Sequence, residues 1–112
     1  MLLARALAQQ APLLLLDEPT THLDLQYQIS LLDRVRDLAR QDGLTVVVAL
    51  HDLNLVSRYA DRVALLVNGE IRAHGQPEEV LQPELLAQVY QLPLQVIYGA
   101  ASGRPVILPA IL

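Results

Sequence analysis

The chain has 112 residues, enough for one domain or part of one, and 53% of them are hydrophobic, so its composition is not that of a disordered protein. Its formal net charge of −4 argues against a nucleic-acid-binding face. The absence of cysteine excludes disulfides and thiolate metal sites, and no apolar run approaches the roughly 18 residues that a membrane-spanning helix needs. We therefore expect no direct insertion into a membrane.

The first segments alternate between helical and strand patterns. Residues 1–10 carry leucines and alanines at helical spacing, and residues 13–16 form a continuous apolar run suited to a strand buried on both faces. Residues 25–41 repeat apolar side chains near a 3.6-residue period, which predicts an amphipathic helix. Asp24 stands at its N-cap position, and Gly43 follows its end.

The later segments are shorter and end in an irregular region. Residues 45–50 are rich in β-branched side chains and predict a second buried strand, after which Asp52 or Asn54 opens a short helix. The pattern then predicts a hairpin of residues 62–67 and 70–73 around Asn68-Gly69, and two proline-started helices at 77–81 and 83–91. From Leu92 onward, extended segments alternate with glycine and proline breaks.

This order predicts an α/β fold with a parallel sheet, flanking helices and a β-hairpin in the carboxyl-terminal part. Parallel sheets place their chemistry beyond the carboxyl ends of the strands. Asp17 and Glu18 directly follow the first strand, and His51 directly follows the second. If the two strands are neighbours, these three side chains converge on one edge of the sheet.

The three side chains suit metal-assisted phosphoryl transfer. Asp17 can hold a hydrated Mg²⁺, because magnesium takes one or two carboxylates together with phosphate oxygens. Glu18 can polarise an attacking water as general base, and His51 can contact a terminal phosphate or orient that water. Each residue also has a structural interpretation: Asp-Glu-Pro is a common turn, a single histidine is usually structural, and Asp24 is a plausible plain helix cap. Their combination after two apolar strands favours function.

The order of the motifs resembles the second half of the ATPase domain of ABC transporters. LLLLDEP (residues 13–19) resembles the Walker B strand with its catalytic glutamate, THLD (21–24) resembles the D-loop, and VVVALHDLN (46–54) resembles the segment of the switch histidine. Residues 60–81, ADRVALLVNGEIRAHGQPEEVL, resemble the tail of importer-type domains. The resemblance implies a partial P-loop NTPase fold.

The resemblance also implies a division of the chain and a role for each site residue. Residues 1–91 would form the carboxyl-terminal half of the ATPase domain and residues 92–112 an extension of it. Asp17 would coordinate Mg²⁺ through water, Glu18 would be the general base, and His51 would contact the γ-phosphate of ATP. Asp24 would act on the nucleotide across a dimer interface.

A setting and a class of solute follow from the same resemblance. Such subunits are cytoplasmic, peripheral on the inner face of the cell membrane, and work with transmembrane permease subunits and a second ATPase subunit. HDLNLVSRYADRV (51–63) and SGRP (102–105) are most similar to the ATPases that serve ferric siderophores, with haem and cobalamin importers close by. The solute itself cannot be read from an ATPase subunit.

The chain departs from the family in its phosphate-binding parts. A G-x-x-x-x-G-K-[ST] loop needs a lysine, but all eight basic residues are arginines, and the glutamine loop and LSGGQ-type signature are also missing. We therefore expect a carboxyl-terminal fragment, arising by truncation, split annotation or a misassigned start, that is inactive by itself. Sequencing the DNA upstream of Met1 would test this expectation.

Two alternatives stay open beside the importer ATPase. The chain can be a non-catalytic remnant or an interaction module that docks on a full-length partner through its D-loop side, although the intact acidic and histidine motifs disfavour decay. It can also be a soluble ABC-type ATPase in DNA repair, because those proteins carry DEPTxxLD-like segments too. The acidic balance, the importer-like tail and the absence of coiled-coil heptads favour the importer.

Overall fold

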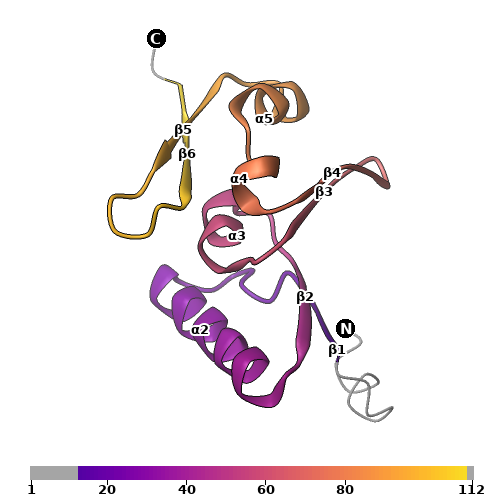
Figure 1. The fold of residues 1–112 in the computed structure, drawn as a ribbon, viewed down its shortest axis with the longest axis vertical. Coiled ribbons are helices and arrows are strands. Elements are labelled where there is room, and N and C mark those ends of the chain that lie inside the picture. The colour runs from indigo at the N-terminus through magenta and orange to yellow at the C-terminus, as the bar shows by residue number, and fades with distance from the viewer. Residues whose placement is uncertain (1–12, 111–112) are drawn as a thin grey trace. The chain divides into compact units, whose positions relative to one another are not determined.

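The computed structural model describes residues 13–110, so the helix predicted for residues 1–10 lies outside the described residues. The described elements are, in chain order, β1 (Leu13–Asp17), α2 (Leu25–Asp42), β2 (Thr45–Ala49), α3 (Leu53–Tyr59), β3 (Val63–Val67), β4 (Glu70–Gly75), α4 (Pro77–Val80), α5 (Pro83–Tyr90), β5 (Leu94–Tyr98) and β6 (Pro105–Pro109) (Figure 1). They form two compact units, one extending to His51 and the other starting at Asp52. The predicted division into residues 1–91 and an extension of residues 92–112 stays a prediction.

The first unit is built on the predicted parallel strand pair. β1 and β2 pair in parallel from Leu13 opposite Thr45 to Asp17 opposite Ala49, and α2 is the crossover helix between them (Figure 1). A crossover of this kind is what a parallel connection requires. The predicted parallel α/β arrangement with a flanking helix is therefore confirmed, within a sheet of two described strands.

The sheet buries one face, whereas both faces were predicted to be buried. On β1, Leu14 and Leu16 are buried and Leu15 is only half-buried, while Val47 opposite Leu15 is 52% exposed. Side chains alternate between the two faces of a strand, so Leu15 and Val47 share the open face. An apolar run such as residues 13–16 is usually covered on both faces. Among the described residues of this unit, the second covering layer is missing.

The carboxyl end of α2 has the predicted cap, whereas its amino end lacks the expected side-chain hydrogen bond. Gly43 adopts the left-handed conformation with φ of +64°, as predicted for the residue that ends the helix. Asp24 occupies the N-cap position with an extended backbone, but its side chain accepts no capping hydrogen bond. The prediction that Asp24 is the N-cap residue of α2 is correct. The capping hydrogen bond expected from its carboxylate is not formed.

The second unit contains two antiparallel hairpins and three short helices. β3 and β4 form the predicted hairpin, closed by Asn68 and Gly69 with φ of +52° and +80°, the positive values that a type I′ turn requires. Asp52, rather than Asn54, caps α3, by accepting hydrogen bonds from two backbone amides. A second hairpin, β5 with β6, fills the region that the sequence left irregular.

The core of this unit draws on most of its elements. Its buried members are Val63, Leu65, Val80, Leu81, Leu86 and Ile107. They come from β3, the segment of α4, α5 and β6, so helices and both hairpins share one apolar cluster. The clustering of apolar side chains from distant segments is the main stabilising contribution here.

Candidate active site

The carboxyl ends of β1 and β2 meet at one edge of the sheet. β1 ends at Asp17 opposite Ala49, and the backbone amide of Glu18 donates a hydrogen bond to the carbonyl of Ala49 at 2.8 Å. The pairing of the two strands thus extends one residue beyond the ladder. Glu18 and His51 consequently leave the sheet at the same edge.

The structure brings the side chains of Glu18 and His51 together. His51 Nε2 lies within ion-pair distance of Glu18 Oε1, and the hydroxyl of Thr21 donates to Glu18 Oε2 at 3.5 Å. The side chain of His51 is 88% exposed and that of Glu18 is 37% exposed, so both can be reached by water. A carboxylate beside an imidazole at an open edge is chemically able to accept a proton from a water molecule.

The backbone after β1 adopts conformations that are uncommon for residues other than glycine. Glu18 has φ of +48° and His22 has φ of +69°. Gln28 of α2 donates to the carbonyl of Leu23 at 3.0 Å, and Thr20 is buried. Strained backbone held by its surroundings is frequent at functional sites, so these residues support a functional interpretation of the loop.

Sequence reasoning missed Thr21 and Gln28. Thr21 contacts the carboxylate of Glu18, and Gln28 holds the loop from the first turns of α2. The role of Gln28 could have been predicted from its place in the first turn of the helix, because a long polar side chain there can reach back to the preceding loop. The hydroxyl of Thr21, three residues after Glu18, lies at the spacing of a local turn.

Asp17 and Asp24 stand apart from the Glu18–His51 pair. Both are exposed, and neither takes part in the Glu18–His51 contact at the sheet edge. Among the described residues, no three histidine or acidic side chains are grouped as a metal site. Magnesium in nucleotide sites takes one or two carboxylates and completes its shell with water and phosphate oxygens, so the exposed carboxylate of Asp17 fits that role. A G-x-x-x-x-G-K-[ST] loop has no counterpart in the sequence, so the usual cradle for the phosphates is missing from it.

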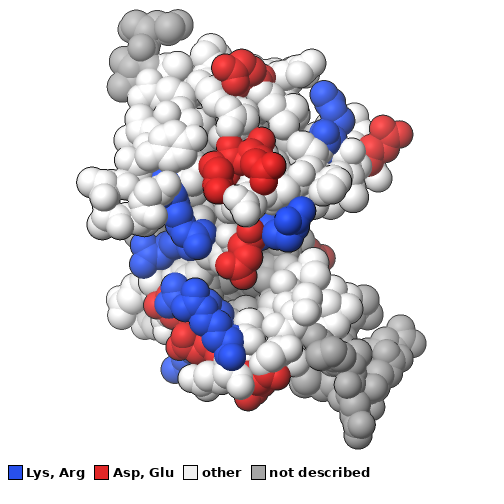
Figure 2. Space-filling view, in the orientation of Figure 1, with Lys and Arg blue, Asp and Glu red and all other residues white. Residues whose placement is uncertain are grey.

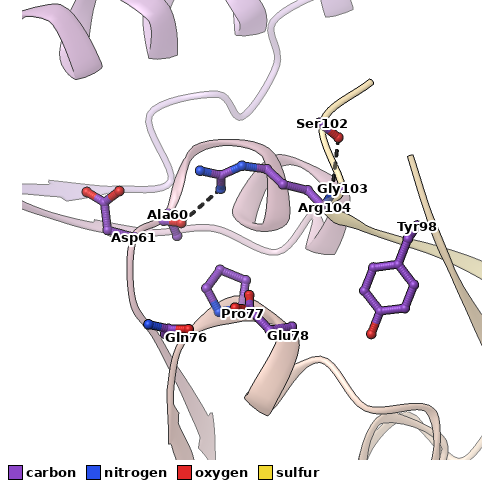
Figure 3. A pocket seen from close by; sticks show the side chains of 9 residues that line it. All are labelled: Ala60, Asp61, Gln76, Pro77, Glu78, Tyr98, Ser102, Gly103 and Arg104. Carbon is purple, nitrogen blue, oxygen red and sulfur yellow. Dashed lines mark hydrogen bonds between the residues drawn. The ribbon is translucent and has the colours of Figure 1, made fainter. Parts of the chain in front are cut away.

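Arginines and acidic side chains are interspersed on the face drawn in Figure 2, which shows no continuous basic surface. Within residues 13–110, no helix is long and apolar enough to cross a membrane. An open cavity of about 620 Å³ lies in the second unit beside Asp61, Glu78, Tyr98 and Arg104, and no predicted site residue lines it (Figure 3).

Comparison with known proteins identifies close relatives of this chain, although no protein-family model matches it. The chain is 50% identical over 107 residues to the hemin import ATP-binding protein HmuV of Nocardia farcinica, covering 96% of the chain and 37% of the relative. It is 41% identical to the ferric enterobactin transport ATP-binding protein FepC of Escherichia coli, covering 96% of the chain and 40% of the relative. It is 44% identical to the cobalamin import ATP-binding protein BtuD of Halobacterium salinarum, covering 96% and 27%.

Solved structures give the same result for the fold. An inward-facing metal-chelate type ABC transporter matches 96% of this chain with a TM-score of 0.79 and 34% identity, over 43% of its own chain. A dimeric ATP-binding cassette in a post-hydrolysis state, bound to ADP and Pi, matches 66% of this chain with a TM-score of 0.56 and 38% identity, over 32% of its own chain. The chain therefore spans less than half the length of the proteins it matches.

Proposed function

Since the chain belongs, in sequence and in fold, with the ATP-binding subunits of ABC importers, we propose that it carries the hydrolysis half of such a subunit. The observation that supports this most directly is the contact between Glu18 and His51 at the edge where two parallel strands end. The relatives are named for import or transport of hemin, ferric enterobactin and cobalamin, which favours a ferric siderophore or a related iron, haem or cobalamin compound as the solute.

The proposed mechanism gives each residue of this chain a separate task. Glu18 accepts the proton of the attacking water, and His51 contacts the γ-phosphate of ATP and keeps the carboxylate of Glu18 oriented. Asp17 would hold Mg²⁺ through water, and the metal, when bound, neutralises charge that develops on the transferred phosphoryl group. Asp24 would act on nucleotide across the interface with a second ATPase subunit. Its carboxylate makes no capping hydrogen bond to α2 and is therefore available for that contact.

The setting follows from the proposed function. The subunit would be cytoplasmic and would lie at the inner face of the cell membrane, bound to transmembrane permease subunits. The chain alone would be inactive, because the lysine and glycine loop that bind the phosphates are missing from its sequence.

A chimera tests this function. The chain should replace the matching residues of the Escherichia coli ferric enterobactin ATP-binding protein, and the chimera should hydrolyse Mg-ATP when assembled with its permease. Glu18→Gln in the chimera should lower the hydrolysis rate by about 100-fold or more, because it removes a general base. Glu84→Gln, at an exposed acidic residue in the first turn of α5, is the matched control and should change the rate little.

Two results would contradict the proposal. If the Glu18→Gln chimera and the Glu84→Gln chimera hydrolyse ATP equally fast, Glu18 is not the general base. Micromolar Mg-ATP binding by the isolated chain, measured by isothermal titration calorimetry, would show that the missing phosphate loop is not needed.

The interaction module remains the second candidate. The open apolar face at Leu15 and Val47 is a surface that a second polypeptide could cover, whether or not the chain takes part in catalysis. Pull-down with full-length relatives distinguishes a module from a remnant. The third alternative, an ATPase in DNA repair, receives no support from the named relatives, which are import and transport proteins.

A further inference from the structure

The loop that follows Glu18 contains two main-chain turns. The backbone amide of Thr21 donates to the carbonyl of Glu18 at 3.2 Å. The backbone amide of Leu23 donates to the carbonyl of Thr20 at 3.1 Å. His22, inside the second turn, has φ of +69°, a value that residues other than glycine rarely adopt. A backbone of this kind persists only where its surroundings hold it.

The side chain of Gln28 holds the turn of residues 20–23 from the start of α2. Its Nε2 donates to the carbonyl of Leu23 at 3.0 Å and to that of Thr20 at 3.5 Å. A glutamine amide has two hydrogens, so one nitrogen can serve both carbonyls. Gln28 is half-buried, and its own backbone amide donates to the carbonyl of Asp24 at 2.9 Å. A side chain that starts from a regular helix therefore binds both ends of the turn.

Thr21 connects the same turn to the carboxylate of Glu18. Its hydroxyl donates to Oε2 of Glu18 at 3.5 Å, whereas His51 Nε2 lies against Oε1. The two carboxylate oxygens thus have neighbours from two segments of one unit. Glu18 itself has φ of +48°, so the direction of its side chain depends on the loop that begins there.

We propose that Gln28 is a positioning residue for the carboxylate of Glu18, acting through the turn of residues 20–23 and the hydroxyl of Thr21. Without the glutamine amide the turn is released, the Thr21 hydroxyl moves, and the carboxylate leaves its place against His51. All of these residues belong to the first unit, which extends to His51. The role of Glu18 as a base rests on the proposed function, whereas the contacts of Gln28 and Thr21 do not.

Chemical labelling of histidine tests the position of Glu18 without nucleotide. Diethylpyrocarbonate acylates imidazole nitrogen, and mass spectrometry of the chimera described above can compare His51 with His74, which is exposed in β4. Gln28→Met keeps the length of the side chain and removes its N–H donors. It should raise the labelling of His51 relative to His74 by about threefold, the scale of one lost hydrogen bond. Glu18→Ala, which removes the carboxylate outright, sets the upper limit.

The control for this labelling is Gln26→Met. Gln26 lies exposed in the same turn of α2, so the substitution is chemically identical and should leave the ratio unchanged. The side chain of His51 is already 88% exposed, so a loss of stability adds little access to it. The ratio therefore reports on the contact with Glu18 and not on general unfolding.

Hydrolysis by the chimera tests the consequence for catalysis. Gln28→Met should lower kcat by about tenfold and leave the KM for Mg-ATP within about twofold, because a displaced base weakens the transition state and not nucleotide binding. Gln28→Lys, which restores an N–H donor on a side chain of similar length, should recover part of kcat. Thr21→Val should lower kcat, whereas Thr21→Ser, which keeps the hydroxyl, should not.

A double-mutant cycle separates positioning from a general structural role. If Gln28 acts through Glu18, then Gln28→Met should change the residual rate of the Glu18→Gln chimera by less than about twofold. A structural role would instead lower the rate by the same factor in both backgrounds. Equal factors would overturn the inference.

The labelling result decides the inference even where hydrolysis does not. An unchanged His51 ratio in Gln28→Met would overturn the positioning role, whatever the rate of hydrolysis. A Glu18→Gln chimera that hydrolyses ATP at the full rate would overturn the proposed function. A raised ratio beside that result would still show that Gln28 positions the carboxylate.

Discussion

At the scale of single residues, two aspartates at helix starts have different roles. Asp52 accepts two backbone hydrogen bonds from the first turn of α3, whereas the carboxylate of Asp24 accepts none at the start of α2. The amide of Tyr27, which an N-cap side chain normally binds, already donates to the main-chain carbonyl of Asp24 at 2.9 Å. The carboxylate of Asp24 is therefore free for another contact.

This difference predicts unequal effects of the same substitution. Asp52→Ala should lower the free energy of unfolding by about 1 kcal/mol, and Asp24→Ala by less than about 0.5 kcal/mol, because only the first removes a capping interaction. Urea unfolding of the two variants within the chimera described above, followed by circular dichroism, compares them. Equal losses for the two variants would show that Asp24 caps α2 in solution.

At the scale of elements, the hairpin β3–β4 separates its two faces sharply. Val63 and Leu65 are buried in the core, whereas Leu66 is 64% exposed and Ile71, its cross-strand partner, is 61% exposed. The alternation of a strand explains the difference, because neighbouring residues point to opposite faces. Hydrophobicity alone does not distinguish Leu65 from Leu66; the register against β4 and the core beneath it do.

Substitutions on the two faces should therefore have very different costs. Leu65→Ala should destabilise the chain by about 2 to 5 kcal/mol, as expected for a buried leucine. Leu66→Thr should change the free energy of unfolding by less than about 0.5 kcal/mol, because the position is exposed and threonine suits a strand. Thermal unfolding of the two variants within the chimera described above compares them. A large loss for Leu66→Thr would mean that this face is covered in the assembled protein.

At the scale of the whole molecule, the two units differ in how they bury apolar surface. The second unit has a core formed by side chains of β3, the α4 segment, α5 and β6. The described residues of the first unit, 13–51, form a two-stranded sheet with one open face. Within residues 13–51, the outer edges of β1 and β2 have no strand partner either, and such edges promote association with other chains. The first unit is therefore the expected source of self-association.

The isolated chain should accordingly aggregate or be only marginally folded. Val47→Lys, on the open face, should lower self-association without loss of structure, whereas Val48→Lys, on the other face, should destabilise the sheet. Sedimentation velocity over a range of concentrations measures the association. A wild-type chain that is monomeric and melts in one sharp two-state transition would refute this prediction.

The amino-acid sequence by itself determined the local elements of this protein. Apolar periodicity, the β-branched run, Gly43 and the Asn68-Gly69 turn each act within a few residues, so the strands β1 and β2, the helix α2 and the first hairpin could be predicted. The same short-range motifs indicated the family and nominated Asp17, Glu18, Asp24 and His51, whose roles stay predictions.

Only the tertiary structure decided how distant segments meet. The contact of Glu18 with His51 depends on the register of two strands, and the open face at Val47 depends on which layers are present. The side chain of Asn54 in α3 bonds to Ile107 in a hairpin that the sequence did not predict. Residue propensities describe neighbours along the chain and carry little information on such contacts. The physical reason is that register and side-chain partners are selected by the packing of the whole unit.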